Sequence, residues 1–293
     1  MKLCSYTING VSSFGAMTSS AGAQGVVDLG WRLADRGVVG AGDLGAVLRQ
    51  GRVRECAEIV AAADADHAVG DITLDKPIAD PGKIFCIGVN YGGRNAEYRD
   101  GSGEQAKPSV FVRYPTSLTA HQGDLVRPPE SEQLDYEGEI VAVIGTAGRR
   151  IAPADARDHI AGLTLGNEGT IRDWVRHAKF NVTQGKNWEA SGSVGPWMVT
   201  LDEIGAFDDL HLTTHVNGEL RQDDTPRSML FSIEFQVAYL STFCTLQPGD
   251  MIFTGTPTGA GARFDPPRFL RPGDVVEVAV PEIGTLRNGV RDE

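Results

Sequence analysis

The segment 134–145, LDYEGEIVAVIG, constrains the fold of this 293-residue chain more than any other stretch. Its apolar, β-branched residues predict a strand, in which successive side chains point to opposite faces. Glu137 and Glu139 therefore point the same way, and Val141 and Val143 follow them on that face. Like charges beside buried valines repel each other and lose hydration as they are covered. Two explanations are open: an edge strand that turns this face to solvent, or a divalent cation that converts the repulsion into ligation.

The rest of the chain divides into two unequal parts. Residues 1–75 carry short strand signals and two short helical patterns, LGAVLRQ and RECAEIVAAADA, and we expect a small N-terminal domain there. Residues 76–293 are rich in glycine and in strand signals, namely KIFCIGVNY, SVFVRYP, LDYEGEIVAVIG, IAGLTLGNE, PWMVT and DVVEVAVP. Asn217-Gly218 predicts a type I′ hairpin, and IRDWVRHAKF and FSIEFQVAYLSTF are the clearest helical patterns. The sequence thus predicts an α+β, β-rich fold with domains at 1–75 and 76–293.

The charge of the chain restricts its partners. A formal net charge of −12 repels nucleic acid and anionic membranes, so we expect neither as a partner. An acidic substrate would need a local group of positive charges for the same reason. No apolar run reaches the length of a signal-peptide core or of a membrane span. The four cysteines stand far apart without a CxxC pair, which indicates reduced thiols in a cytoplasmic protein.

A third acid would favour the metal explanation, because two carboxylates seldom suffice to hold a hard cation such as Mg²⁺. The segment GLTLGNEGTIRDW offers Glu168, which ends an apolar strand pattern and directly precedes a helical one. An acid at that position also serves to cap the following helix, so both roles are open. No paired-cysteine motif competes for a softer metal such as zinc.

Eight short motifs follow one another between residues 83 and 290. They are IGVNYGGRNAE, PSVFVRYPTSL, LDYEGEIVAVIG, LTLGNEGTIRD, QGKNWEASGSVGPW, VNGELRQ, LQPGDMIFTGTPTGAG and FLRPGDVVEV. In this order they resemble the fumarylacetoacetate hydrolase family. The resemblance implies a mixed β-strand roll, the catalytic fold of that family, preceded here by the small N-terminal domain. It also implies Mg²⁺ or Mn²⁺ held by carboxylates, usually in a homodimer.

The resemblance assigns roles to individual residues. The family's E-x-E pair falls on Glu137 and Glu139, and its third metal ligand, normally an aspartate, falls on Glu168. Glutamate is one methylene longer, so the metal would lie farther from the strand, or the backbone would withdraw. Cationic and polar matches are expected to serve an anionic substrate: Lys186 as a catalytic residue, and Arg113, Arg172, Gln222 and Thr256 as binding residues. Without the resemblance we would interpret Lys186 as a surface lysine, and Thr256 could equally be part of a plain loop.

In the family's hydrolases a histidine–glutamate dyad activates water, and this chain departs from that pattern. The family motif NYxxHxxE is NYGGRNAE here, so Arg94 occupies the histidine position while Glu97 keeps the glutamate. Arginine cannot act as a base at neutral pH. We therefore expect Glu97 to be the catalytic base and Arg94 to bind a substrate carboxylate. His121 is the alternative base.

The substrates that the resemblance implies are acylpyruvates and related 2-keto or 1,3-diketo acids, whose adjacent oxygens can chelate a metal. The metal would act as a Lewis acid and stabilise the enolate that develops when a C–C bond breaks. Hydrolysis of a C–C bond in such an acid is the expected reaction. The alternatives are isomerisation or decarboxylation of a 2-hydroxydienoate or a 2-keto diacid, and a catalytically silent paralogue that binds metal and ligand without turnover.

Overall fold

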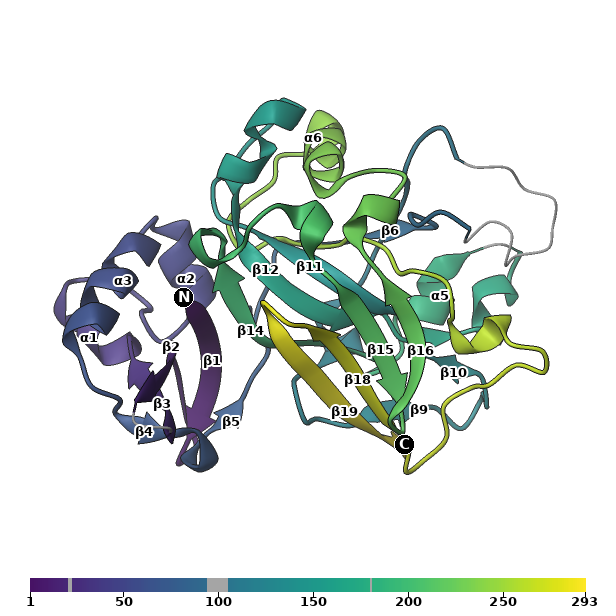
Figure 1. Cartoon of the computed structure of the whole chain (residues 1–293), viewed down its shortest axis with the longest axis horizontal. Helices are drawn as coiled ribbons and strands as arrows, with labels where there is room; N and C mark the ends of the chain where they lie inside the picture. Colours follow the sequence, from purple (N-terminus) through teal and green to yellow (C-terminus); the bar gives the residue numbers. More distant parts are fainter. Residues whose placement is uncertain (21–22, 94–104, 180) are drawn as a thin grey trace.

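A large mixed sheet forms the centre of the protein (Figure 1). The computed structural model describes residues 1–20, 23–93, 105–179 and 181–293. Neighbouring strands of the large sheet follow the order β4 (His67–Ala68), β3 (Ala23–Asp28), β2 (Val11–Ser20), β1 (Lys2–Ile8), β14 (Gly192–Thr200), β12 (Ile160–Asn167), β11 (Gly138–Ile144), β17 (Met251–Phe253), β6 (Ile84–Gly88) and β7 (Ser109–Val112). β5 (Thr73–Leu74) pairs with β1, and β8 (Leu118–Thr119) pairs with β14. The α+β, β-rich fold expected from the sequence is confirmed.

A second sheet packs on one face of the large one, and Figure 1 shows its strands in front of β11 and β12. Its order is β16 (Glu219–Asp224), β15 (Leu212–Val216), β18 (Val275–Val280), β19 (Gly284–Asp292) and β9 (Leu125–Arg127). Ile140 and Ala142 of β11 share one apolar cluster with Val278 of β18 and with Val237 of helix α6 (Ile233–Phe243). The main core therefore lies between the two sheets and this helix.

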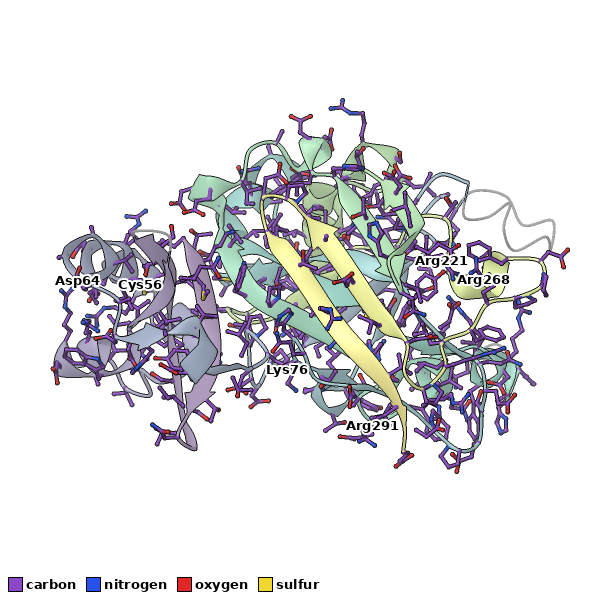
Figure 2. The ribbon with its side chains drawn as sticks, turned by 60° about the horizontal axis from the view of Figure 1, so that its bottom comes forward. Cys56, Asp64, Lys76, Arg221, Arg268 and Arg291 are labelled. Atoms are coloured by element: carbon purple, nitrogen blue, oxygen red, sulfur yellow. The ribbon has the colours of Figure 1, made fainter. Side chains whose placement is uncertain are left out.

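The opposite face of the large sheet is covered by the N-terminal part of the chain. Val141 and Val143 of β11 belong to one apolar cluster with Leu3 and Phe14 and with helices α1 (Gly30–Asp35), α2 (Leu44–Arg49) and α3 (Val53–Ala62). β1 pairs antiparallel with β14, so the sheet runs without a break from residues 1–75 into the rest. Lys76 lies at this junction, where its ammonium donates to the Pro115 carbonyl at 2.9 Å (Figure 2). The division at residues 1–75 and 76–293 stays a prediction.

Two of the local predictions are confirmed and one is wrong. The hairpin is confirmed, because β15 and β16 pair across Asn217 and Gly218, which both have positive φ. The helix over FSIEFQVAYLSTF is confirmed as α6. The helix over IRDWVRHAKF is wrong: β13 (Thr170–Ile171) pairs with β10 (Leu134–Asp135), and a 3₁₀ turn, Asp173–Arg176, follows within the described residues 171–179. Pairing with β10 draws the start of this segment into a sheet. A short helix, α5 (Val182–Lys186), comes next.

None of the helices in the described ranges combines the length and the apolar character that crossing a membrane requires.

Candidate metal centre

Glu137, Glu139 and Glu168 meet in one buried cluster, in which one carboxylate oxygen of each lies within 4.8 Å of the others. Their proximity follows from the sheet. β11 and β12 are antiparallel with Gly138 opposite Asn167, so the start of β11 lies beside the end of β12. The amide of Glu168 donates to the carbonyl of Glu137 at 2.8 Å, which ties the two segments together. The three acids that the sequence singled out therefore form one site.

The edge-strand explanation for the glutamates is wrong. β11 lies between β12 and β17 in the interior of the sheet, and Glu139 is only 1% exposed. Glu137 precedes β11 by one residue, in the gap after β10, and so is not itself a strand residue. Val141 and Val143 extend from Glu139 into the apolar cluster beneath, as their alternation predicts. Carboxylates at this depth need a counter-charge.

Three cationic side chains supply counter-charge. Lys186 Nζ lies 2.5 Å from Glu137 Oε2 and 3.0 Å from Glu168 Oε2. Arg172 Nη2 lies 2.7 Å from Glu137 Oε1. Arg113 is buried and lies farther away, with Nη1 3.9 Å from Glu168 Oε1, and its guanidinium donates mainly to Ser117, Gly169 and Ser191. The predicted cations Lys186, Arg113 and Arg172 are thus all at the acid cluster.

Negative charge is concentrated at this site. The buried carboxylates of Asp135 and the three glutamates lie beside Lys186, Arg172 and Arg113. Burial, reinforced by the charges of Glu168 and Glu137, raises the pKa of Glu139 well above its usual range. Burial therefore favours the protonated form of Glu139 when no cation is bound.

The donor set fits a hard divalent cation. All three ligands offer carboxylate oxygens, which Mg²⁺ and Mn²⁺ prefer. Glu168 Oε1 is buried and has no hydrogen-bond partner within the described ranges. Such an unsatisfied buried oxygen calls for an unseen partner, and a cation would provide one.

Gln222 and Thr256, predicted to bind substrate, form a hydrogen-bonded brace around Gly138. The Gly138 amide donates to Gln222 Oε1 at 2.9 Å, and Thr256 Oγ1 donates to the Gly138 carbonyl at 2.9 Å. Gln222 Nε2 donates in turn to Thr256 Oγ1 at 2.8 Å. A Cβ on Gly138 would lie 2.0 Å from Thr214 Oγ1, so only glycine fits between the two glutamates. The brace therefore fixes the backbone that carries Glu137 and Glu139.

The acid cluster forms the floor of a cavity of about 680 Å³, a volume typical of small-molecule sites. Thr256 lines it, whereas Gln222 is not among the described lining residues. Arg176 and Arg263 also line it, and the sequence analysis missed both. Nothing in their local sequence distinguishes them from surface arginines. The cavity thus combines an acidic floor with cationic walls.

Three further residues were predicted from the sequence. Arg94 and Glu97, the proposed carboxylate-binding residue and base, lie outside the described residues. His121 accepts a hydrogen bond from the Arg287 amide at 3.2 Å and is not among the described residues that line the cavity. Its burial, followed by the charge of Arg287, lowers its pKa.

This chain is similar to a known family and to several known proteins. Residues 83–291 match the family described as fumarylacetoacetate (FAA) hydrolase C-terminal. The chain is 41% identical over 228 residues to oxaloacetate tautomerase YisK of Bacillus subtilis (strain 168), which covers 76% of this chain and 75% of that protein. It is 36% identical over 225 residues to the 4-hydroxyphenylacetate degradation bifunctional isomerase/decarboxylase of Salmonella dublin, with 77% of this chain and 50% of that protein covered. The solved structure of fumarylacetoacetate hydrolase from psychrophilic Exiguobacterium antarcticum matches with a TM-score of 0.80 and 29% identity, over 100% of both chains.

Proposed function

The chain belongs to the fumarylacetoacetate hydrolase family, and from this premise we propose that it is a metal-dependent enzyme that interconverts the keto and enol forms of a small 2-keto diacid. The observation that carries the proposal is the buried cluster of Glu137, Glu139 and Glu168, with Lys186 against it, on the floor of a cavity with arginine in its walls. The name of the Bacillus relative, an oxaloacetate tautomerase, supports this reaction class. Oxaloacetate is accordingly the first substrate to test.

The three glutamates would hold Mg²⁺ or Mn²⁺, which when bound would supply a Lewis acid for the keto oxygen. Lys186 contributes a fixed positive charge beside them, because the glutamate charges outweigh its burial and raise its pKa. That ammonium favours negative charge on the oxygen of the substrate as a proton leaves the adjacent carbon. We assign the removal of this proton to Glu97 and the binding of a substrate carboxylate to Arg94.

Hydrolysis of a C–C bond, the first expectation from the sequence, is the second candidate. The likeness to the hydrolase from Exiguobacterium antarcticum favours it. It would require activated water, and Arg94 replaces the histidine that the family's hydrolases use for this purpose. Keto–enol interconversion moves a proton without breaking a C–C bond, so it does not need that histidine.

The reaction is tested by following the ultraviolet absorbance and the proton NMR spectrum of enol oxaloacetate. With Mg²⁺ or Mn²⁺ the protein should speed conversion to the keto form beyond the rate with metal alone, and a chelator should abolish the gain. Release of two acid fragments from an acylpyruvate would instead identify a hydrolase. Ligand-induced stabilisation with no product from either substrate would leave the silent binding protein and contradict an enzymatic function.

The metal is tested separately. Glu137→Gln, Glu139→Gln and Glu168→Gln should each weaken Mn²⁺ binding in a calorimetric titration without loss of the fold. Unchanged affinity in all three variants would overturn the metal centre. If Glu168→Gln alone bound the metal like the wild-type protein, the third ligand would lie elsewhere.

We propose further that the protein is a homodimer in the cytoplasm, as the family resemblance and the free cysteines suggest. Light scattering at micromolar concentration should give twice the chain mass of 31.3 kDa. A mass equal to a single chain would contradict the dimer.

A further inference from the structure

Asp135 is a fully buried acid that lies two residues before Glu137 and belongs to no assigned role so far. It accepts four hydrogen bonds. Oδ1 accepts from the amides of Tyr136 at 2.9 Å and Gly261 at 2.8 Å, and Oδ2 accepts from the amide of Ala262 at 3.0 Å and from Arg172 Nε at 2.7 Å. Asp135 is not among the described residues that line the cavity, so it acts on the site only through these partners.

The first partners of Asp135 are the amides of Gly261 and Ala262, which belong to a turn in the cavity wall. Gly261–Arg263 forms a short 3₁₀ turn, and Ala262 and Arg263 line the cavity. A Cβ on Gly261 would lie 2.6 Å from Asp135 Oδ1 and 2.2 Å from the Arg268 carbonyl, so the turn packs against Asp135 as closely as a glycine allows. Beyond the turn, Arg268 pairs with Glu219, which also pairs with Arg221; Figure 2 shows the two arginines beside each other.

The second partner of Asp135 is Arg172, which connects it to the metal centre. Arg172 donates through Nε to Asp135 and through Nη2 to Glu137 Oε1, at 2.7 Å in each case. One guanidinium is therefore shared between a buried acid and a proposed metal ligand. If Asp135 lost its charge, Arg172 would pair more strongly with Glu137 and would compete with a cation for the same oxygen.

We propose that Asp135 is a positioning residue that couples the metal ligand Glu137, through Arg172, to the cavity wall at Gly261–Arg263. The proposal deepens the proposed function and rests on its metal centre. A buried aspartate that accepts backbone amides often serves stability alone, and the experiment must separate that role from coupling. The discriminating quantity is the affinity for the metal, measured without substrate.

Asp135→Asn is the first variant, because it keeps the shape and one acceptor oxygen but replaces Oδ1 or Oδ2 with a nitrogen that cannot accept. Calorimetric titration with Mn²⁺ should give an affinity about tenfold weaker than in the wild-type protein. KM should rise severalfold, since the wall carrying Arg263 loses its anchor. At saturating metal and substrate, kcat should stay within about threefold of the wild-type value.

Asp250→Asn is the matched control. Asp250 is also buried; its Oδ2 accepts from the Gln247 amide at 2.8 Å and lies 2.7 Å from Lys83 Nζ. It sits at the far end of β11, where its carbonyl accepts from the Ile144 amide. This variant should lose thermal stability as Asp135→Asn does, yet bind Mn²⁺ like the wild-type protein. An equal loss of Mn²⁺ affinity in both variants would overturn the proposal, as would affinity within twofold of wild type in Asp135→Asn.

Arg172→Met tests the route of the coupling and serves if Asp135→Asn does not fold. Removal of the competing guanidinium should strengthen Mn²⁺ binding about threefold or more, whereas a weaker or unchanged affinity would overturn the proposal. In a double-mutant cycle, Asp135→Asn should weaken Mn²⁺ binding much less in the Arg172→Met background than alone. These metal-binding results do not depend on the reaction. If the wild-type protein bound Mn²⁺ but failed to interconvert oxaloacetate, the proposed function would be contradicted and the role proposed for Asp135 would not.

Discussion

The ammonium of Lys186 and the carboxylate of Glu137 form a buried ion pair with 2.5 Å between Nζ and Oε2. Burial by itself would lower the pKa of Lys186, but the charges of Glu137 and Glu168 outweigh it and raise the pKa above its usual value. Lys186 is therefore a permanent cation at neutral pH and is unsuited to act as a base. Its position beside two proposed metal ligands is consistent with the charge-stabilising role that we propose for it.

Lys186→Met should separate metal binding from catalysis. Loss of a positive charge next to the acids should leave Mn²⁺ affinity equal to or tighter than that of the wild-type protein. At the same time kcat/KM should fall by about two orders of magnitude, because a group that stabilises developing negative charge is missing. Calorimetry and steady-state kinetics measure the two quantities. A parallel loss of metal binding would show that Lys186 holds the site together instead.

Glu139→Gln should stabilise the metal-free protein. The folded-state pKa of Glu139 is raised, so the stability that this group contributes is present at low pH and is lost as the pH rises through that pKa. Glutamine has no charge to bury, so the variant does not lose this stability as the pH rises. Its amide oxygen can still accept a hydrogen bond from the Gly255 amide. In chelator, the variant should melt higher than the wild-type protein, and the difference should grow as the pH rises. Excess Mg²⁺ should reverse the order, because only the wild-type protein gains fully from binding.

Metal binding should release about one proton, since a cation can bind Glu139 only after its proton leaves. Mn²⁺ affinity should then rise as the pH rises through the raised pKa of Glu139. Titrations in two buffers with different ionisation enthalpies measure the release directly. Glu139→Gln is the control and should release none. Equal heats in both buffers for the wild-type protein would contradict the proton assigned to Glu139.

Gln222→Ala should lower both stability and metal affinity. It breaks the brace around Gly138 and leaves a buried amide without its acceptor, which costs about 2 kcal/mol. Asn288→Ala is the matched control, because Asn288 is also buried and donates to the Ala120 and Gly123 carbonyls. Chemical denaturation should show a similar loss for both, with weaker Mn²⁺ binding only in Gln222→Ala. A direct role of Gln222 in substrate binding would instead raise KM at unchanged stability.

Arg94→Ala should mainly raise KM if Arg94 binds a substrate carboxylate, because that contact is shared by the ground and transition states. The effect should shrink for a substrate that lacks the carboxylate. Glu97→Gln should mainly lower kcat. Arg94→His provides the converse test: a gain in acylpyruvate hydrolysis, with loss of the native reaction, would indicate that the wild-type chemistry is not cleavage by water.

The sequence predicted the parts of the site that depend on local pattern. Alternation predicted that Glu139 and Val141 share a face, and strand and turn signals predicted β11, β12 and the hairpin at Asn217. These features need only neighbouring residues to form. The same holds for Glu168, which an apolar strand pattern places at the end of β12.

The sequence did not predict the contacts between distant segments. Asp135 meets the amide of Gly261, 126 positions later in the chain, and Gln222 meets Gly138 across 84 positions. No local signal distinguishes a polar side chain that will bind a ligand from one that will accept a backbone amide. The helix expected over 171–180 failed for a related reason, since pairing with β10 is set by residues outside that segment.

The continuous pairing of β1 with β14 has a consequence for any shortened form of this protein. A fragment without the first 75 residues would leave one side of β14 with bare N–H and C=O groups where β1 lies. It would also remove Leu3 and Phe14 from the apolar cluster that contains Val141, two residues along β11 from Glu139. An open, apolar strand edge invites association with other chains. Such a fragment should precipitate before it can be assayed, although it retains every residue of the acid cluster.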